Sequence, residues 1–309
     1  MENFRDHPLN RVHTIDTSMN SLWEFYRKNF IMLYIFSVVI SLVTQYASSF
    51  VMIDIANLQS ETDPMVMLEK IREYLLPMAL ISLMNLLFTA ILQHYILYNP
   101  VDNENNIFRS VIKSLRYFIP FLVLIILLSF TGAIAIILGL LALVVGAVFA
   151  VIYIMTLYLF ILPVMMVEGP DIGNTISSVF KLAHRNFWSN FGWVSAFIIL
   201  LIVISFILSG LVMVPFAGSF FKTIVNPEEA SSVSGFAKNP LFIILSALAN
   251  ALTIPLMPIF STILYFNGKA RENKIGQDYL PEKQEERVKV EDLYAKPYSD
   301  DHPDNPEKK

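Results

Sequence analysis

Long apolar runs alternate with short polar segments along the chain. Six of these runs contain no Asp, Glu, Lys or Arg over about the 20 residues that a helix needs to cross a hydrocarbon layer. They predict membrane-spanning helices with these bounds: 30–53, 75–98, 118–137, 140–162, 192–214 and 241–266. The third and fourth come from one charge-free stretch, 117–167, which exceeds the length of a single span and which we divide near Gly139.

The composition agrees with this pattern. Apolar residues make up 55% of the chain and charged residues 16%, whereas a soluble domain averages about 45–50% and about 25%. These values exclude a simple soluble enzyme and favour an all-helical protein that crosses the membrane several times. The chain has no cysteine, which excludes thiol catalysis and disulfides and fits either side of a membrane.

The basic residues indicate the orientation, because cytoplasmic loops of membrane proteins carry an excess of Lys and Arg. Six spans place both termini on one side, and 18 of the 22 Lys and Arg residues fall on that side. We therefore expect both termini in the cytoplasm. The first run is not expected to be a cleaved signal, because the polar segment 1–29 precedes it and it exceeds an h-region of about 7–15 residues.

Short segments before the first, third and fifth spans resemble one another. Each combines basic residues with aromatic or aliphatic residues at helical spacing. They are residues 21–30, 111–118 and 179–188. The pattern predicts an all-α polytopic fold of six transmembrane helices in three parallel hairpins, each hairpin preceded by an amphipathic helix in the cytoplasmic membrane interface.

Cations on the second and third of these segments are candidates for contact with lipid headgroups. An amphipathic helix at the interface holds its Lys and Arg near anionic headgroups, and Trp is enriched there. The candidates are Arg109, Lys113, Arg116, Lys181, Arg185 and Trp188. Two interpretations remain open, since ordinary anchors and a specific headgroup site use the same residue types.

Polar residues and prolines inside the spans are candidates for lining a cavity. Polar groups are costly in hydrocarbon, so they mark either bonds between helices or contact with a substrate. The candidates are Asn85, His94, Asn250, Pro255 and Pro258. The paired prolines predict a kink or an unwound stretch within 250–258. Because no span contains Asp, Glu, Lys or Arg, the sequence argues against an ion-coupled transporter.

Few residues suggest catalysis. Glu168 and Asp171 are possible acid groups that would act with His94, although a turn at Gly169 and Pro170 and a helix cap at Asp171 or Asn174 explain them more simply. No histidine pair has the spacing of a metal site, and no phosphate-binding or nucleophile motif is present. We expect no catalytic residue, no metal, no cofactor and no contact with nucleic acid.

Three glycines recur every seven residues, at Gly132, Gly139 and Gly146. This spacing permits close helix packing. Gly139 is also the expected turn residue, so the two interpretations compete at that position.

The chain divides into three parts. Residues 1–29 are a cytoplasmic N-terminal segment with an interfacial helix, 30–267 are the six-span membrane domain, and 268–309 are a charged cytoplasmic tail. The composition of the tail predicts disorder, because it has too few apolar residues to bury a core. The tail either improves solubility or binds a cytoplasmic partner.

The stretch Leu162-Pro163-Val164-Met165-Met166-Val167-Glu168-Gly169-Pro170, with residues 176–182 and 186–188 after it, resembles a bacterial membrane family. This is the six-span domain found fused to some glycerophosphodiester phosphodiesterases and also alone as uncharacterised integral membrane proteins. The resemblance implies a bacterial inner-membrane protein connected with lipids or the envelope. In the fused relatives a separate soluble barrel carries the hydrolysis, so we expect no phosphodiesterase activity here.

Together these patterns favour a non-enzymatic membrane protein that binds or organises lipids. Uncharged spans and the basic, aromatic segments before them motivate this hypothesis. A transporter or permease for an apolar or zwitterionic small molecule is the alternative, motivated by the prolines and amides within the spans.

Overall fold

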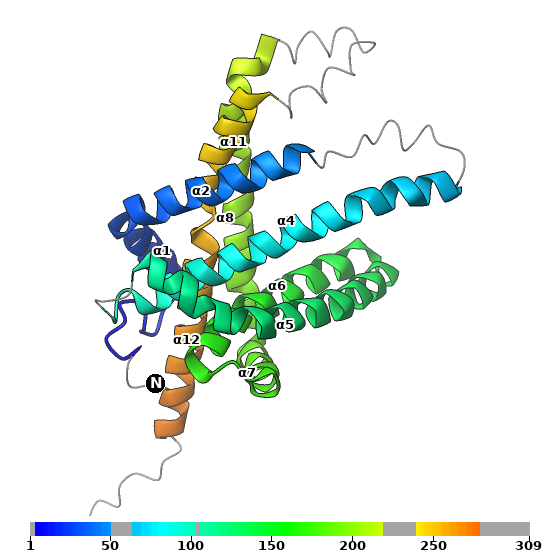
Figure 1. Ribbon diagram of the computed structural model, residues 1–309. Coiled ribbons are helices and arrows are strands. Elements are labelled where there is room, and N and C mark those ends of the chain that lie inside the picture. The colour runs from blue at the N-terminus through cyan, green and yellow to red at the C-terminus, as the bar shows by residue number, and fades with distance from the viewer. Residues whose placement is uncertain (1–3, 51–63, 103–105, 219–238, 279–309) are drawn as a thin grey trace, which may run out of the picture. The chain divides into compact units, whose positions relative to one another are not determined.

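A computed structural model describes residues 4–50, 64–102, 106–218 and 239–278. Contacts divide the chain into two units, Met1–Ala270 and Arg271–Lys309. Every regular element among the described residues is a helix. In chain order (Figure 1) they are α1 Ile15–Lys28, α2 Phe30–Phe50, α4 Pro64–Tyr98, α5 Ile107–Leu141, α6 Leu143–Glu168, α7 Ile172–Arg185, α8 Phe187–Met213, the 3-10 helix η2 Val214–Phe216, α11 Pro240–Thr253 and α12 Leu256–Asp278.

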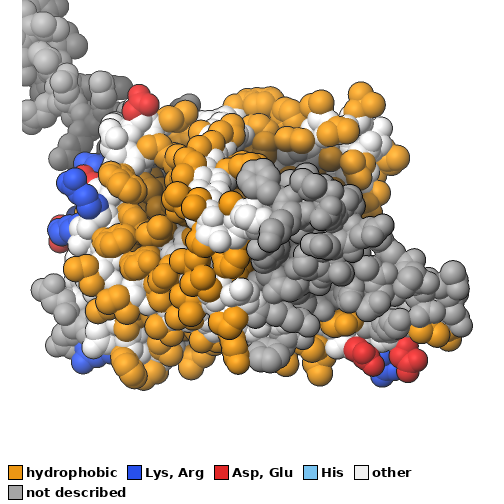
Figure 2. Space-filling view, turned by 90° about the horizontal axis from the view of Figure 1, so that it is seen from above, with side chains coloured by type: hydrophobic (Ala, Val, Ile, Leu, Met, Phe, Trp, Pro, Cys, Tyr) orange, Lys and Arg blue, Asp and Glu red, His pale blue; other side chains and the backbone are white. Residues whose placement is uncertain are grey.

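Six segments of the described chain are long and apolar enough to cross a membrane. They are Phe30–Ser49, Arg72–Tyr98, Ile107–Leu141, Leu143–Glu168, Phe187–Phe216 and Pro240–Glu272. Each overlaps one of the six runs expected from the sequence. Their outer surface is also apolar, since Leu141 is 79% and Phe206 80% exposed. On the part of the face that Figure 2 colours, hydrophobic side chains predominate and charged ones lie at the margins, as the hydrocarbon layer requires.

Burial is concentrated at one end of the spans. Most buried residues fall in the first half of α2, α5 and α8 and in the last half of α4 and α6, with exceptions such as Gly132 of α5 and Val212 of α8. Successive spans therefore bring opposite ends to the same core. At their other ends the same helices expose large apolar side chains, such as Ile137 and Leu143 on the α5–α6 pair.

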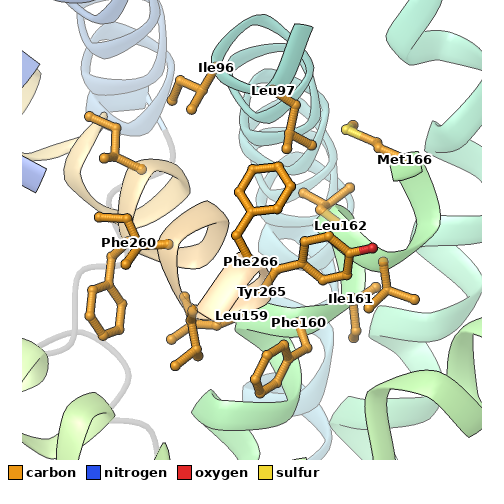
Figure 3. Close-up of a cluster of buried hydrophobic side chains, with 14 of the residues drawn as sticks. Ile96, Leu97, Leu159, Phe160, Ile161, Leu162, Met166, Phe260, Tyr265 and Phe266 are labelled. Carbon is orange, nitrogen blue, oxygen red and sulfur yellow. The ribbon is translucent and has the colours of Figure 1, made fainter. Parts of the chain in front are cut away.

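Helix α12 forms the middle of this core. Every residue from Pro258 to Asn267 is buried. Phe260 stacks on Phe197 of α8, with ring centroids 4.0 Å apart and 7° between the planes. Figure 3 shows Phe260, Tyr265 and Phe266 among apolar side chains of α4 and α6. Full burial explains why this helix lacks one-sided patterning.

Polar side chains of α12 bond to its neighbours within the core. Ser261 Oγ donates to the backbone oxygen of Leu159 on α6 at 2.5 Å. Gln93 Nε2 on α4 donates to Thr262 Oγ1 at 2.8 Å. These bonds satisfy polar groups that would otherwise be orphaned in an apolar interior, where each unpaired group costs about 1–3 kcal/mol.

The turn between the third and fourth spans lies later than expected. Helix α5 continues through Gly139 to Leu141, Ala142 forms the turn, and α6 starts at Leu143 with φ 73°. Gly139 packs instead of turning: a Cβ on Gly139 would lie 2.6 Å from the backbone oxygen of Gly146. Gly139 and Gly146 have no side chain between the helices, so the backbones of α5 and α6 can touch there. The two glycines therefore lie on either side of the turn at Ala142 and not in the turn itself.

Two of the three expected leading helices are separate elements. Helix α1 ends before Asn29 and α7 ends before Asn186, and α2 and α8 begin at the next residue. The second segment, 111–118, is instead a continuous part of α5. An asparagine side chain can compete for the backbone hydrogen bonds of a helix and so interrupt it. The Nδ2 of Asn29 competes in this way, because it donates to the Phe25 oxygen at 3.0 Å. No asparagine stands at the corresponding place in α5.

The sixth span is broken, as the prolines predict. Helix α11 ends at Thr253, Ile254 and Pro255 form the break, and α12 starts at Leu256. Helix α12 then continues to Asp278, so the region from 268 to 278 is helical and not part of a disordered tail. A side chain at Gly268 would meet Leu182 of α7 at 3.1 Å, so α12 is still packed against α7 at this position. Residues 279–309 of the expected tail lie outside the described residues.

We expect Gly139→Ala to destabilise the α5–α6 pair. The new Cβ would overlap backbone atoms of Gly146 and Ala147, and overpacking of this kind costs about 1–3 kcal/mol. The free energy of unfolding in mixed micelles would measure the loss. Gly210→Ala in α8 is the matched control, because nothing lies within 4 Å of its added Cβ. Equal stability of the two variants would contradict the packing described.

Candidate functional site

The N-terminal segment is part of the core. Phe4, His7, Leu9 and His13 are each at most 7% exposed. Phe4 meets Tyr98 of α4 edge-on at 5.2 Å between ring centroids. The segment before α1 is therefore packed against the end of α4 that carries Tyr98.

His7 is held in one neutral tautomer. Its Nδ1 accepts the backbone N–H of Leu9 at 3.2 Å, so its Nε2 carries the proton and donates to the Ile96 oxygen at 3.1 Å. The ring packs on Phe25 of α1 and Phe266 of α12. Burial lowers the pKa of His7 to about 4, against the bond to Ile96, which raises it. Protonation of Nδ1 would break the hydrogen bond that it accepts from the backbone N–H of Leu9.

His13 joins the N-terminal segment to α12. Its backbone N–H donates to Asn267 Oδ1 at 3.0 Å, and its Nε2 lies 3.2 Å from the Leu9 oxygen. Burial is the main cause that lowers the pKa of His13, and the nearby charge of Arg11 lowers it further. The two histidines therefore fasten the segment in their neutral forms.

Glu168 connects three helices at the end of α6. Its carboxylate lies 2.8 Å from Lys269 Nζ on α12 and accepts from Ser178 Oγ on α7 at 2.7 Å and from Tyr265 on α12 at 3.1 Å. The side chains of Glu168 and Lys269 are only 20% and 18% exposed. Charge-assisted bonds of this type are stronger than neutral ones, so Glu168 sets the position of α7 against α12.

Aromatic residues gather where α7 meets α8. His184 Nδ1 lies 2.9 Å from the Phe180 oxygen and its Nε2 3.2 Å from Tyr153 Oη. Donation of Nδ1–H to the carbonyl leaves Nε2 to accept from the tyrosine. Trp188 is 73% exposed and lies against Phe187. An exposed indole at the end of a span is typical of an anchor at the membrane interface.

Two apolar cavities flank the α5–α6 pair. The smaller, about 170 Å³, lies under α7 and is bordered by Tyr153, Ile176 and Phe180. The larger, about 980 Å³, faces α8 and is bordered by Tyr158, Ile198 and Phe206. Both share Leu128, Gly132 and Ile154. Their linings are almost entirely apolar, so they suit hydrocarbon rather than a polar solute.

The six candidate headgroup residues lie in two groups. Arg109, Lys113 and Arg116 are exposed on the first turns of α5, where Lys113 pairs with Asp102 at 3.7 Å. On α7 and at the start of α8, Lys181 and Trp188 are exposed and Arg185 is half-buried. The second group adjoins the aromatic residues beside the smaller cavity.

The five candidate cavity residues lie on α4, on α11, at the break after it and on α12, away from the two apolar cavities. Asn85 and Asn250 are exposed on their helices, whereas His94, Pro255 and Pro258 are buried in protein. None of the five borders either apolar cavity. His94 Nδ1 lies 3.1 Å from Ser110 Oγ, and its ring stacks on Tyr98. Its surroundings are those of a packed core residue.

The possible acid groups have separate structural roles. Asp171 caps α7 by accepting the backbone N–H of Asn174 at 2.7 Å. Glu168 joins α6, α7 and α12, and His94 bonds within the α4–α5 contact. Within the described ranges, no group of three His, Asp or Glu residues is placed to hold a metal ion.

No family model, curated protein or solved structure matches this chain. The resemblance to the six-span domain stays a prediction.

The sequence did not single out the packed N-terminal segment. His7 and His13 have no metal-site spacing, and Leu9 stands alone among polar neighbours, so no periodic signal marks them as core. One weak signal was Thr14, which caps α1 together with Thr17 and fixes where the segment leaves the helix.

Acid should weaken the attachment of the N-terminal segment. The folded pKa of His7, about 4, lies below its ordinary value of 6.5, so its contribution is complete above pH 6.5 and is lost as the pH falls toward 4. Linkage gives a loss of about 2 kcal/mol at pH 5. Thermal unfolding between pH 7.5 and 5 should show a smaller change for His7→Phe than for wild type. Trp188→Phe, outside the segment and without a titratable group, should keep the wild-type dependence; equal slopes for all three proteins would refute this account.

The Glu168–Lys269 and Asp102–Lys113 ion pairs should differ in strength. We expect Glu168→Gln to lower the free energy of unfolding by about 1–3 kcal/mol, because the mostly buried Lys269 would lose its contact with the Glu168 carboxylate. Asp102→Asn breaks the exposed pair with Lys113 and should cost less than about 1 kcal/mol. Denaturant titration of both variants makes the comparison, and similar losses would show that Glu168 is not the connector described.

Proposed function

We propose that this protein is a non-enzymatic integral membrane protein that binds membrane lipids. The observation that carries the proposal is the pair of apolar cavities on the two sides of the α5–α6 contact. The spans α5 and α6 form a wall of both cavities, with α7 beside the smaller one and α8 beside the larger one. The larger cavity, about 980 Å³, lies within the range of ligand sites, about 300–1,000 Å³, whereas the smaller one, about 170 Å³, lies below it.

The smaller cavity lies next to groups suited to a lipid headgroup. Ile176, Val179 and Phe180 of α7 border it, and Lys181 follows Phe180 on the same helix. Tyr153, which also borders it, bonds to His184 one turn further along α7. In this proposal an acyl chain enters under α7 and the phosphate meets Lys181 and Arg185, each worth about 1 kcal/mol near an anionic surface.

Topology and location form part of the same proposal. The distribution of Lys and Arg supports both termini in the cytoplasm, with the spans as three successive hairpins. Helices α1 and α7 would lie in the cytoplasmic interface, and the first turns of α5 would take that place for the middle hairpin. The resemblance noted above supports a bacterial inner membrane. The alternative of a transporter stays a prediction, motivated now by the observed break at Ile254 and Pro255.

Removing the cations of α5 and α7 should weaken binding to anionic vesicles. The variant carries Gln at Lys113, Arg116, Lys181 and Arg185, and we expect at least about tenfold weaker retention of phosphatidylglycerol, because several headgroup attractions are lost together. Native mass spectrometry after reconstitution with a defined lipid mixture measures how much phosphatidylglycerol each protein retains. Unchanged retention would overturn the proposal.

A second comparison separates a specific site from general attraction. Lys181→Gln with Arg185→Gln removes two charges beside the smaller cavity, and Arg5→Gln with Arg27→Gln removes two exposed charges elsewhere on the same side. A specific site predicts a larger loss for the first pair. Equal losses of lipid retention in the two double variants would indicate that Lys181 and Arg185 are ordinary membrane anchors.

A further inference from the structure

A third cavity lies between the N-terminal segment, α1 and the end of α4. Its volume is about 550 Å³ and, unlike the other two, it is bordered by charged and polar side chains. The polar residues that matter below are Asp6, Arg11, Glu24, Lys28, Asn29 and Asn99. Two cations, two carboxylates and two amides thus face one space.

The opening lies at the level of the membrane boundary. Asn29 directly precedes the span that begins at Phe30, and Asn99 directly follows the span that ends at Tyr98. The polar ends of two spans therefore border this cavity. Beyond Asn29, Ile31 is 74% and Ile35 57% exposed on the first turns of α2, so hydrocarbon begins within a turn of the polar wall.

The charges around the cavity do not neutralise one another. Among the described residues, Asp6, Glu24 and Lys28 form no ion pair, and Arg11 bonds to Ser21 Oγ at 2.7 Å rather than to a carboxylate. Elsewhere the same chain does pair its charges, as in Lys269–Glu168. A cavity that keeps both signs of charge unpaired is complementary to a ligand that carries both.

The floor of the cavity is fixed. Leu9, Ser21 and Phe25 border it and are at most 7% exposed. His7, beside Leu9, ties this floor to α4 through the Ile96 oxygen. Ser21 Oγ accepts from Arg11 and donates to the Thr17 oxygen, which holds the guanidinium at the wall. Preorganised walls reduce the entropy lost on binding.

We propose that this cavity binds a zwitterion made of a primary ammonium and a phosphate. The headgroup of phosphatidylethanolamine and soluble phosphoethanolamine share that chemistry. Asp6 and Glu24 accept from the ammonium, and Arg11 and Lys28 donate to the phosphate. In its lipid form the inference deepens the lipid-binding function proposed above, and it assigns a second, chemically different headgroup site.

The charge pattern discriminates against other headgroups. Carboxylates at Asp6 and Glu24 repel a purely anionic headgroup such as phosphatidylglycerol. The quaternary ammonium of choline has no N–H to donate, so those carboxylates would lose their hydrogen bonds. The cavity therefore selects ethanolamine over both.

The test uses the full chain, delipidated in detergent and then offered equal amounts of phosphatidylethanolamine, phosphatidylcholine and phosphatidylglycerol. Native mass spectrometry counts each retained lipid, and calorimetry with phosphoethanolamine examines the soluble source. Wild type should retain ethanolamine lipid over choline lipid. Glu24→Gln and Lys28→Gln should each lower that retention by about five- to tenfold, because each removes one charge-assisted contact in a half-open site.

Controls separate this site from the anionic one. Glu73→Gln changes an exposed carboxylate at the other end of α4 and should leave all three lipids unchanged. The fourfold Gln variant of α5 and α7 should lose phosphatidylglycerol and keep phosphatidylethanolamine, whereas Glu24→Gln should do the reverse. Failure of the lipid-binding function and failure of this inference thus give different results.

Each outcome decides the inference. Selective ethanolamine lipid that is lost in Glu24→Gln and Lys28→Gln supports the lipid source, and phosphoethanolamine binding lost in the same variants supports the soluble source. No preference for ethanolamine and no binding of phosphoethanolamine would overturn it. Retention unchanged by both substitutions would overturn it as well.

Discussion

The buried stretch of α12 determines how the rest of the first unit is arranged. A helix buried on every side must satisfy its polar side chains within the protein, and each bond it makes specifies a neighbour. Thr262 selects α4, Ser261 selects α6, and Asn267 selects the N-terminal segment. Tyr265 reaches Glu168 at the end of α6. Apolar packing alone would hold these elements together, but it would not determine which turn of α12 lies against which turn of each neighbouring helix.

The same arrangement explains why the two kinds of cavity differ. Near the packed end, polar bonds bring loops, helix ends and the N-terminal segment together, and the cavity left among them is charged. Further along the spans, α5 and α6 touch mainly each other, and the spaces beside them are lined by apolar side chains. The lining of the cavities thus changes along the spans from charged to apolar side chains.

The sequence predicted what depends on composition and local chemistry. Spans follow from length and apolarity, the break at Pro255 from the missing backbone donor, and the cap at Asp171 from its side chain. The sequence left two interpretations open at Gly139, because a glycine that permits a turn and one that permits close packing look alike in sequence, and the structure shows close packing. Position 111–118 was misassigned since amphipathic patterning does not show where a helix is interrupted.

What the sequence did not predict depends on partners far apart in the chain. His7 bonds to Ile96, and nothing near His7 indicates that carbonyl. The zwitterion cavity draws on the N-terminal segment, α1 and the end of α4, so no local motif contains it. A single sequence reports local preferences, and such sites are produced by long-range contacts.

The bond between His13 and Asn267 also bears on biosynthesis. These residues are 254 positions apart, so the segment synthesised first cannot complete its packing until the last span has been made and inserted. Contacts of such separation form late, because closing the intervening chain is entropically unfavourable. During translation His7, Leu9 and Phe4 remain outside their final places. The native core is therefore completed only after the part of the chain that carries Asn267 has been made.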